Sequence, residues 1–134
     1  MPLIVVLDTN ILTVPAQFGV DIFAETERIL ERSIEFVVLQ SVVGELRRNL
    51  VHETKAGSYR FKIALDLVQR CRVVEPREPR EGIPVDDEIL RYAITSDGVV
   101  ATNDRKLKER ALSQGTPVLY LRGRKQLQLI GSIP

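Results

Sequence analysis

Short apolar runs alternate along this chain with longer segments in which apolar residues recur every three or four positions. The first run, 3–7, is apolar at every position and contains two valines and one isoleucine. Such a run is typical of a strand that is buried on both faces, as in a parallel sheet. Comparable runs predict further strands at 36–39, 72–74, 98–101 and 118–121.

The segments with helical spacing carry charged residues between their apolar positions. They predict helices over 17–33, from Ser41 as N-cap to about 50, after Gly57 to about 70, from Asp86 to about 94, and from Asp104 to Gly115. Three prolines and a glycine within 76–84 predict a loop. The tail from Arg122 leaves two interpretations open, an edge strand or a surface for a partner.

Strands that alternate with helices indicate an α/β fold of three layers, α/β/α, around a central and mostly parallel sheet of four to five strands. The length of 134 residues fits one domain, 1–134, with a core of its own. No internal repeat or low-complexity segment interrupts this order. The sequence therefore predicts a single globular domain.

Composition narrows the class of protein only a little. The net charge of +1 excludes neither a nucleic acid nor a protein as partner, since a basic patch can lie within a balanced total. Cys71 is the single cysteine, so no disulfide can form within the chain. No apolar run approaches the roughly 18 residues of a membrane span, and the start lacks the basic region of a signal peptide. We therefore expect a cytoplasmic protein without a membrane segment.

Four acidic residues fall at equivalent places in this order of elements. In a parallel α/β sheet each strand ends at one edge, and the helix that follows begins near the same edge, where ligands bind. Asp8 directly follows the first strand, and Glu45 lies near the start of the helix after the second. Asp86 and Asp104 lie at the helix starts before and after the strand 98–101. We therefore expect all four carboxylates at one edge of the sheet.

Clustered carboxylates repel one another, so such a site takes up protons or a cation. Hard oxygen ligands suit Mg²⁺ or Mn²⁺, which bind one or two carboxylates together with water and substrate phosphate. An ion held there can polarise a phosphodiester and activate a water molecule. The predicted cluster thus indicates a metal-dependent nuclease or phosphatase.

Each of these acids also has a purely structural interpretation. Aspartate is a favoured N-cap and complements the helix dipole, which alone could explain Asp86 and Asp104. Glu45 could be an ordinary solvent-exposed helix residue. Asp8 is harder to explain in this way, because a charged residue at the end of a fully apolar strand is uncommon unless it has a functional role. Basic residues that follow Asp104 are candidates for binding RNA phosphates, with solvated surface as the alternative: Arg105, Lys106 and Lys108.

The surroundings of the four acids resemble those in PIN-domain ribonucleases. The similarity lies in the opening strand with Asp8, in the segments that carry the other three acids, and in a stretch that resembles stand-alone archaeal PIN proteins: 4–10, 41–46, 86–89, 100–104 and 14–21. Each motif alone is weak, but all four acids occur in order over nearly the whole chain. The relatives implied are VapC-type toxins and the PIN nuclease that processes small-subunit ribosomal RNA.

The resemblance implies a PIN-like fold and an endoribonuclease that uses Mg²⁺ or Mn²⁺ and leaves 5′-phosphate and 3′-hydroxyl ends. Catalysis and metal binding would fall to Asp8, Glu45, Asp86 and Asp104, with Asp87 as the alternative third acid. Neighbouring residues would support the cluster: Thr9, Asn10, Asp87, Thr102 and Asn103. The implied partners are RNA, a second copy in a homodimer or higher oligomer, and an antitoxin protein.

Two other functions remain as alternatives. A metal-dependent phosphatase of the haloacid-dehalogenase type requires Asp-x-Asp after the first strand, and Asn10 occupies the second position. A non-catalytic RNA-binding or assembly module could keep the same fold, but such a module would be expected to have lost an acid. The choice between a toxin and a ribosomal RNA processing enzyme stays open.

Overall fold

The computed structural model describes residues 1–75 and 82–133. Within them one sheet contains six strands in the order β3-β2-β1-β4-β5-β6. The first five of these pair in parallel, and β6 pairs with β5 in antiparallel fashion. The strands are β1 (Leu3–Leu7), β2 (Ile34–Leu39), β3 (Arg72–Val74), β4 (Val99–Ala101), β5 (Val118–Arg122) and β6 (Gln126–Ile130).

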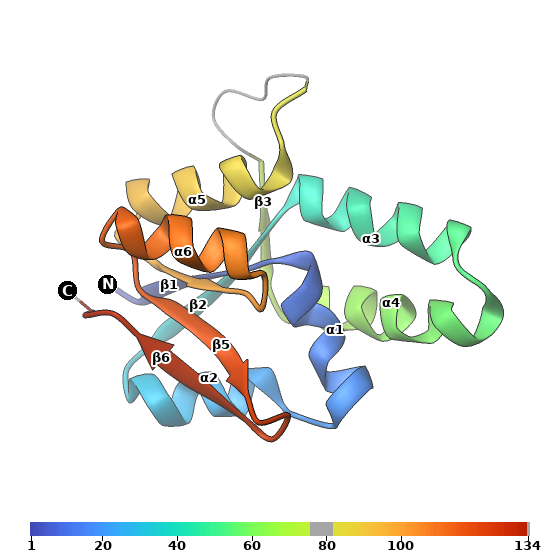
Figure 1. Cartoon of the computed structure of the whole chain (residues 1–134), viewed down its shortest axis with the longest axis horizontal. Helices are drawn as coiled ribbons and strands as arrows, with labels where there is room; N and C mark the ends of the chain where they lie inside the picture. The colour runs from blue at the N-terminus through green and yellow to red at the C-terminus, as the bar shows by residue number, and fades with distance from the viewer. Residues whose placement is uncertain (76–81, 134) are drawn as a thin grey trace.

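Helices connect the parallel strands and cover both faces of the sheet. Figure 1 shows α5 and α6 on one side of the sheet and α2 on the other, while the hairpin of α3 and α4 extends beyond the edge at which β1 ends. The helices are α1 (Thr9–Phe18), α2 (Ile22–Leu30), α3 (Gln40–His52), α4 (Lys55–Val68), α5 (Val85–Thr95) and α6 (Arg105–Ser113). The predicted α/β fold with three layers is thus confirmed.

The core lies along the two central strands. Val5, Val6 and Leu7 are at most 1% exposed, and all of β4 is buried. β1 lies between β2 and β4, and the order of the strands reverses at this point. In open α/β sheets such a reversal creates a crevice at the carboxyl ends of the two strands. The fold therefore offers a binding site where β1 and β4 end.

The predicted helix over 17–33 is wrong in its extent, because two helices occupy this region. α1 begins directly after Asp8, which caps it, and ends at Gly19 with a left-handed φ of 66°. Asp21 then caps α2. The prediction missed α1 because Asp8-Thr9-Asn10 also suits a turn and because Pro15 interrupts the helical signal.

Other boundaries also differ from the prediction. Ser41 is not an N-cap, since α3 begins at Gln40 and no side chain caps it. α4 begins before Gly57, because the hydroxyl of Thr54 accepts a hydrogen bond from the Gly57 N–H at 3.2 Å. The tail forms β6, an edge strand, which brings the sheet to six described strands instead of four to five.

Two further expectations concern the predicted loop at 76–84 and the lack of a membrane segment. Residues 76–81 of the predicted loop lie outside the described residues. Among residues 1–75 and 82–133, no helix has both the length and the apolar character that a membrane crossing requires.

Candidate active site

The four predicted acids line one cavity of about 310 Å³ at the carboxyl edge of the sheet. Two of them directly flank the reversal in strand order, because Asp8 follows β1 and Asp104 lies between β4 and α6. The other two belong to helices that approach this edge from either side, Glu45 to α3 and Asp86 to α5. Pro84, Val85 and Ile89 complete part of the wall. Carboxylates up to 96 positions apart in the sequence thus share one space.

Asp8 is buried, with 4% of its surface exposed, and both of its oxygens are engaged. Oδ1 accepts a hydrogen bond from the Ile11 N–H at 2.7 Å, which caps α1. Oδ2 accepts a hydrogen bond from the Thr102 hydroxyl. These two bonds fix the orientation of the carboxylate at the end of β1.

Thr102 connects two of the acids. Its buried hydroxyl donates to Asp8 and accepts a hydrogen bond from the Asp104 N–H at 2.9 Å. The Asp104 carboxylate in turn accepts from the Leu107 N–H at 3.1 Å and caps α6. Asp104 is therefore the N-cap that the structural interpretation of this residue expected. It also lines the acid cavity.

Asp86 and Asp87 point to different surroundings, although both lie in the first turn of α5. Asp86 lines the acid cavity and does not cap the helix, whose N-cap position is Pro84. Asp87 forms an ion pair with Arg110 of α6, with 2.7 Å between Oδ1 and Nη2. The geometry therefore favours Asp86 over Asp87 as the third acid of the cavity.

Electrostatic coupling shows how close the acids are to one another. The pKa of Asp8 is raised from 3.8 to about 7, chiefly by burial; hydrogen bonds from Thr102 and Ile11 oppose this shift, and the charges of Asp86 and Asp104 add to it. Burial also raises the pKa of Asp86, and Asp104 and Glu45 add to this effect while Arg110 opposes it. The cavity is thus a region of negative potential that a cation would relieve.

The donor set suits a hard divalent cation that the substrate helps to bind. Carboxylate oxygens are the ligands that Mg²⁺ and Mn²⁺ prefer. Among residues 1–75 and 82–133, no three acidic, histidine or cysteine side chains converge into a group that could hold a metal ion by itself. In proteins Mg²⁺ is commonly bound by one or two carboxylates together with several waters and a phosphate.

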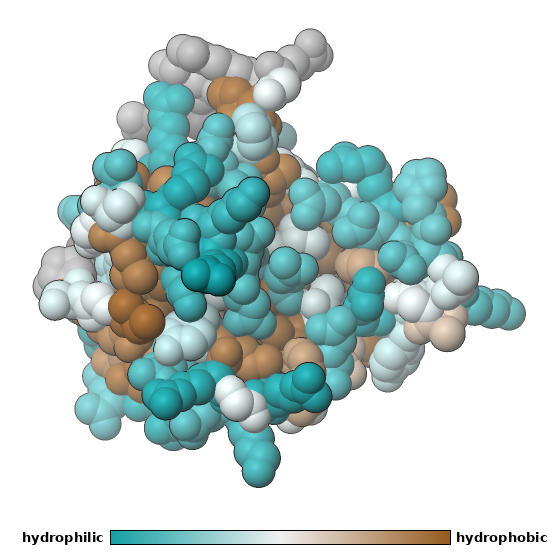
Figure 2. Space-filling view, viewed as in Figure 1, coloured by the Kyte–Doolittle hydropathy of each residue, from teal (hydrophilic) through white to brown (hydrophobic). Residues whose placement is uncertain are grey.

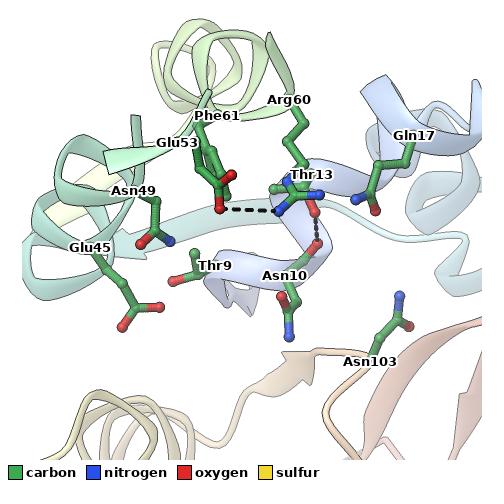
Figure 3. A pocket seen from close by; sticks show the side chains of 10 residues that line it. All are labelled: Thr9, Asn10, Thr13, Gln17, Glu45, Asn49, Glu53, Arg60, Phe61 and Asn103. Carbon is green, nitrogen blue, oxygen red and sulfur yellow. Dashed lines mark hydrogen bonds and ion pairs between the residues drawn. The ribbon is translucent and has the colours of Figure 1, made fainter. Parts of the chain in front are cut away.

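A second cavity of about 410 Å³ adjoins the first and shares Thr9, Asn10 and Glu45 with it. Figure 3 shows that it lies between α1, α3 and α4 and that polar side chains surround it. Its further lining residues are Thr13, Gln17, Asn49, Glu53, Arg60, Phe61 and Asn103. We call this space the amide pocket, after its carboxamide side chains.

Among the expected supporting residues, three lie at the amide pocket. Thr9 is buried and its hydroxyl has no hydrogen-bond partner within the described part of the chain. Asn10 lies where the two cavities meet. Asn103 accepts a hydrogen bond from the Leu121 N–H at 2.7 Å, which connects the loop after β4 to β5.

The amide pocket contains residues that the sequence analysis missed, although a signal for them exists. Asn10, Thr13 and Gln17 recur at helical spacing, and together they form one polar face of α1. Glu45, Asn49 and Glu53 follow the same rule at the end of α3. The stripe on α1 was not recognised because α1 itself was not predicted.

The three predicted RNA-binding residues lie on α6 outside both cavities. Arg105 pairs with Glu109, with 3.1 Å between Nε and Oε1, and the ammonium of Lys108 lies 4.4 Å from the centre of the Tyr120 ring. Figure 2 shows hydrophilic side chains gathered over α6. The structure thus places Arg105, Lys106 and Lys108 on a solvated helix that begins at the acid cavity.

Comparison with models of known protein families identifies the class of protein to which this fold belongs. A family model described as a PIN like domain matches residues 5–124. The chain belongs to this family.

Among curated proteins, the chain is similar to Ribonuclease VapC4 of Methanocaldococcus jannaschii. The two are 30% identical over 132 residues, which cover 96% of this chain and 98% of that protein. The similarity therefore extends over nearly the whole chain.

Solved structures share the fold. The PIN domain endonuclease Utp24 matches with a TM-score of 0.78 and 24% identity, over 98% of this chain and 94% of that one. VapBC2 from Rickettsia felis, bound to a DNA fragment from its promoter, matches with a TM-score of 0.57 and 17% identity over 80% and 92%. At these identities the likeness concerns the fold alone.

Proposed function

We propose that this chain is a metal-dependent endoribonuclease that hydrolyses phosphodiester bonds of RNA in the acid cavity. The observation that carries the proposal is the convergence of four carboxylates from distant segments on one cavity of a PIN-family fold. The relative of 30% identity is named a ribonuclease, which supports RNA as the substrate class. All four acids expected of a catalytic member are present at this cavity.

Asp8, Glu45, Asp86 and Asp104 would hold Mg²⁺ or Mn²⁺. The bound ion would polarise the phosphodiester and lower the pKa of the attacking water. Asp8 is the most constrained of the four, since Ile11 and Thr102 hold its two oxygens. Thr102 and the neighbouring polar residues would keep the carboxylates oriented: Thr9, Asn10, Asp87 and Asn103.

The test is an RNA cleavage assay with Mn²⁺ or Mg²⁺, with and without a chelator. We expect cleavage that the chelator abolishes and products with 5′-phosphate and 3′-hydroxyl ends. Asp86→Asn and Asp87→Asn form a matched pair, because only Asp86 lines the cavity. We expect Asp86→Asn to lose cleavage and Asp87→Asn to keep most of it, since Asp87 would only help to orient the acids. Unchanged cleavage in the chelator would contradict the proposed metal dependence.

The same assay separates the two alternative functions. A non-catalytic RNA-binding or assembly module would bind the RNA and leave it uncut at every metal concentration. A metal-dependent phosphatase would release inorganic phosphate from phosphomonoesters and leave internal bonds intact. Asn10, in place of a second aspartate, argues against the phosphatase, as it did in the sequence.

The biological role and the partners follow as further parts of the proposal. The chain would act either as a toxin restrained by an antitoxin protein or as a processing enzyme of ribosomal RNA, and it would form homodimers or higher oligomers. The name of the relative VapC4 and the fold of VapBC2 support an antitoxin partner. Mapping the cut sites on total RNA distinguishes the two roles, and light scattering gives the oligomeric state.

A further inference from the structure

We propose that the amide pocket binds a single unpaired base of the RNA, next to the phosphodiester that is cleaved. This inference rests on the proposed function, since the acid cavity must hold the phosphate for the pocket to hold its neighbour. The pocket volume of about 410 Å³ lies within the range of about 300–1,000 Å³ found for small-molecule sites. The pocket would thus give the enzyme a base preference.

The carboxamides of the lining match the edges of bases. A carboxamide presents a donor and an acceptor side by side, as the Watson–Crick edge of a base does. Asn10, Gln17 and Asn49 line the pocket, and their side chains form no hydrogen bond with another residue in the described part of the chain. Asn103 uses only its carbonyl oxygen, as acceptor for Leu121. The lining therefore offers several unused donors and acceptors.

Arg60 supplies a flat surface on which a base can stack. Its guanidinium carbon lies 4.7 Å from the centre of the Phe61 ring, and Phe61 is itself 6% exposed. An ion pair with 3.8 Å between Arg60 Nη2 and Glu53 Oε1 further restrains the guanidinium. Figure 3 shows the guanidinium reaching into the pocket near Thr13. Bases stack on arginine planes as they do on aromatic rings.

The charge balance of the pocket favours a base over a phosphate. Two carboxylates, Glu45 and Glu53, line it together with one cation, Arg60. A phosphate would be repelled by this excess of negative charge, whereas a neutral base would not. The acid cavity next to it would accept the phosphate once a divalent cation neutralises it.

The position of the pocket determines which nucleotide it would hold. Thr9, Asn10 and Glu45 line both cavities, so a base in the amide pocket would lie next to a phosphate in the acid cavity. The buried Thr9 hydroxyl, unpartnered among the described residues, lies at this boundary. The nucleotide that is bound would therefore directly flank the cut.

The first experiment sequences the cut sites in a random single-stranded RNA pool digested by the wild-type chain with Mn²⁺. We expect one base to be favoured at one position beside the cut. Asn49→Leu removes a carboxamide, and Arg60→Lys keeps the charge and removes the plane. Asn49→Leu is expected to reduce this preference about tenfold, because a well-formed bidentate contact contributes roughly 1–3 kcal/mol of discrimination. Arg60→Lys is expected to leave the preference unchanged and to weaken binding of the base, because every base can stack on the plane that it removes.

Gln69→Leu, at the end of α4 and outside the pocket, is the matched control and should keep the preference. Thermal melting checks that every variant is folded, and Gln17→Leu replaces Asn49→Leu if the latter unfolds. Uniform cut sites in the wild type, or an unchanged preference in the folded carboxamide variant, would overturn the proposal.

The second experiment measures binding of short single-stranded RNAs by fluorescence anisotropy in an Asp8→Asn background. We expect Asn49→Leu and Arg60→Lys to weaken binding about tenfold for a normal RNA and not at all for one that lacks the base at the critical position. This readout does not require cleavage. If the wild-type chain binds RNA with this base dependence but never cuts it, the proposed function would be disproved, whereas the base-binding role of the amide pocket would stand. Equal weakening with both RNAs would overturn the pocket itself.

Discussion

The two edges of the parallel sheet differ sharply, although turns between strands and helices form both. At the carboxyl edge β1 and β4 end, α1, α5 and α6 begin, and four carboxylates line a cavity of about 310 Å³. At the amino edge α5 and α6 end, and a smaller cavity of about 110 Å³ lies among Gly98, Gly115, Thr116 and other residues. Among the residues that the structure describes, Asp97 is the only acid that lines it.

The difference follows from the direction of the helices. Their N-termini present unpaired N–H groups and a positive end of the dipole, which stabilise carboxylates such as Asp8 and Asp104. Their C-termini present carbonyl groups, next to which a carboxylate is unfavourable. Acidic chemistry and tight backbone packing thus lie at opposite edges of one sheet, and paired substitutions can test this separation.

The largest expected effect is the loss of activity in Asp8→Asn. RNA cleavage should fall by at least about 10³-fold, because the variant loses a carboxylate that would hold an ion contributing several kcal/mol to the transition state. Asp97→Asn at the amino edge is the control and should cleave normally, since asparagine tolerates the left-handed φ of 52° at this position. Initial rates with Mn²⁺ measure both, and equal losses in the two variants would contradict the separation of the edges.

Gly98→Ala should lower stability and leave the chemistry intact. A Cβ at this position would lie 2.7 Å from the carbonyl oxygen of Ile4 in β1, a backbone atom that cannot move aside easily. We expect a loss of about 2–3 kcal/mol in the free energy of unfolding, as in other overpacked sites. Urea denaturation measures it, and the rate of RNA cleavage per folded molecule should be unchanged.

Gly44→Ala is the control for this prediction. A Cβ at Gly44, inside α3, would meet only the flexible end of Arg48 at 3.4 Å. Alanine should therefore raise the free energy of unfolding by about 0.5–1 kcal/mol. If Gly98→Ala were as stable as Gly44→Ala, the close approach of β4 to β1 would not matter.

Thr102→Val should weaken the use of metal. The variant removes the hydroxyl that connects the Asp8 carboxylate to the Asp104 backbone while it keeps the shape of the side chain. We expect activity at limiting Mn²⁺ to drop about 10- to 100-fold, with partial recovery at high Mn²⁺, as for other residues that orient metal ligands. Thr116→Val, buried at the amino edge, should show the wild-type Mn²⁺ dependence. Identical Mn²⁺ curves for all three proteins would exclude this role of Thr102.

A pH dependence of stability is expected in the absence of divalent cations. The pKa of Asp8 is about 7 in the folded chain against an ordinary value of 3.8, so between these values the folded chain keeps a proton that the unfolded chain loses. The wild type should therefore lose stability relative to Asp8→Asn as the pH rises from about 4 to about 7, and the difference should be constant above that range. Denaturation of both proteins across this range in chelator measures the effect, and a pH-independent difference would contradict the burial of the charge.

The acids show how far local patterns reach. An apolar run followed by Asp8 is recognisable without any neighbour, and the order of elements then assigns the other three acids to the same edge. Asp86 against Asp87 could not be resolved in this way, because both lie in the same helical turn and only the packing of α6, with Arg110, separates them. The role of Thr102 as a connection between Asp8 and Asp104 likewise appears only when β1 and β4 lie side by side.

The sequence by itself determined the α/β architecture and the edge at which the acidic residues gather, because periodicity identifies the strands and helices and their alternation makes the strands parallel. The tertiary structure decided which pocket lies beside the acidic residues. The amide pocket depends on how α1, α3 and α4 pack against one another, and contacts between elements far apart in the chain leave no local pattern that fixes their geometry. Chemistry at the ends of strands is therefore predictable from this sequence, whereas the shape that would select a substrate is not.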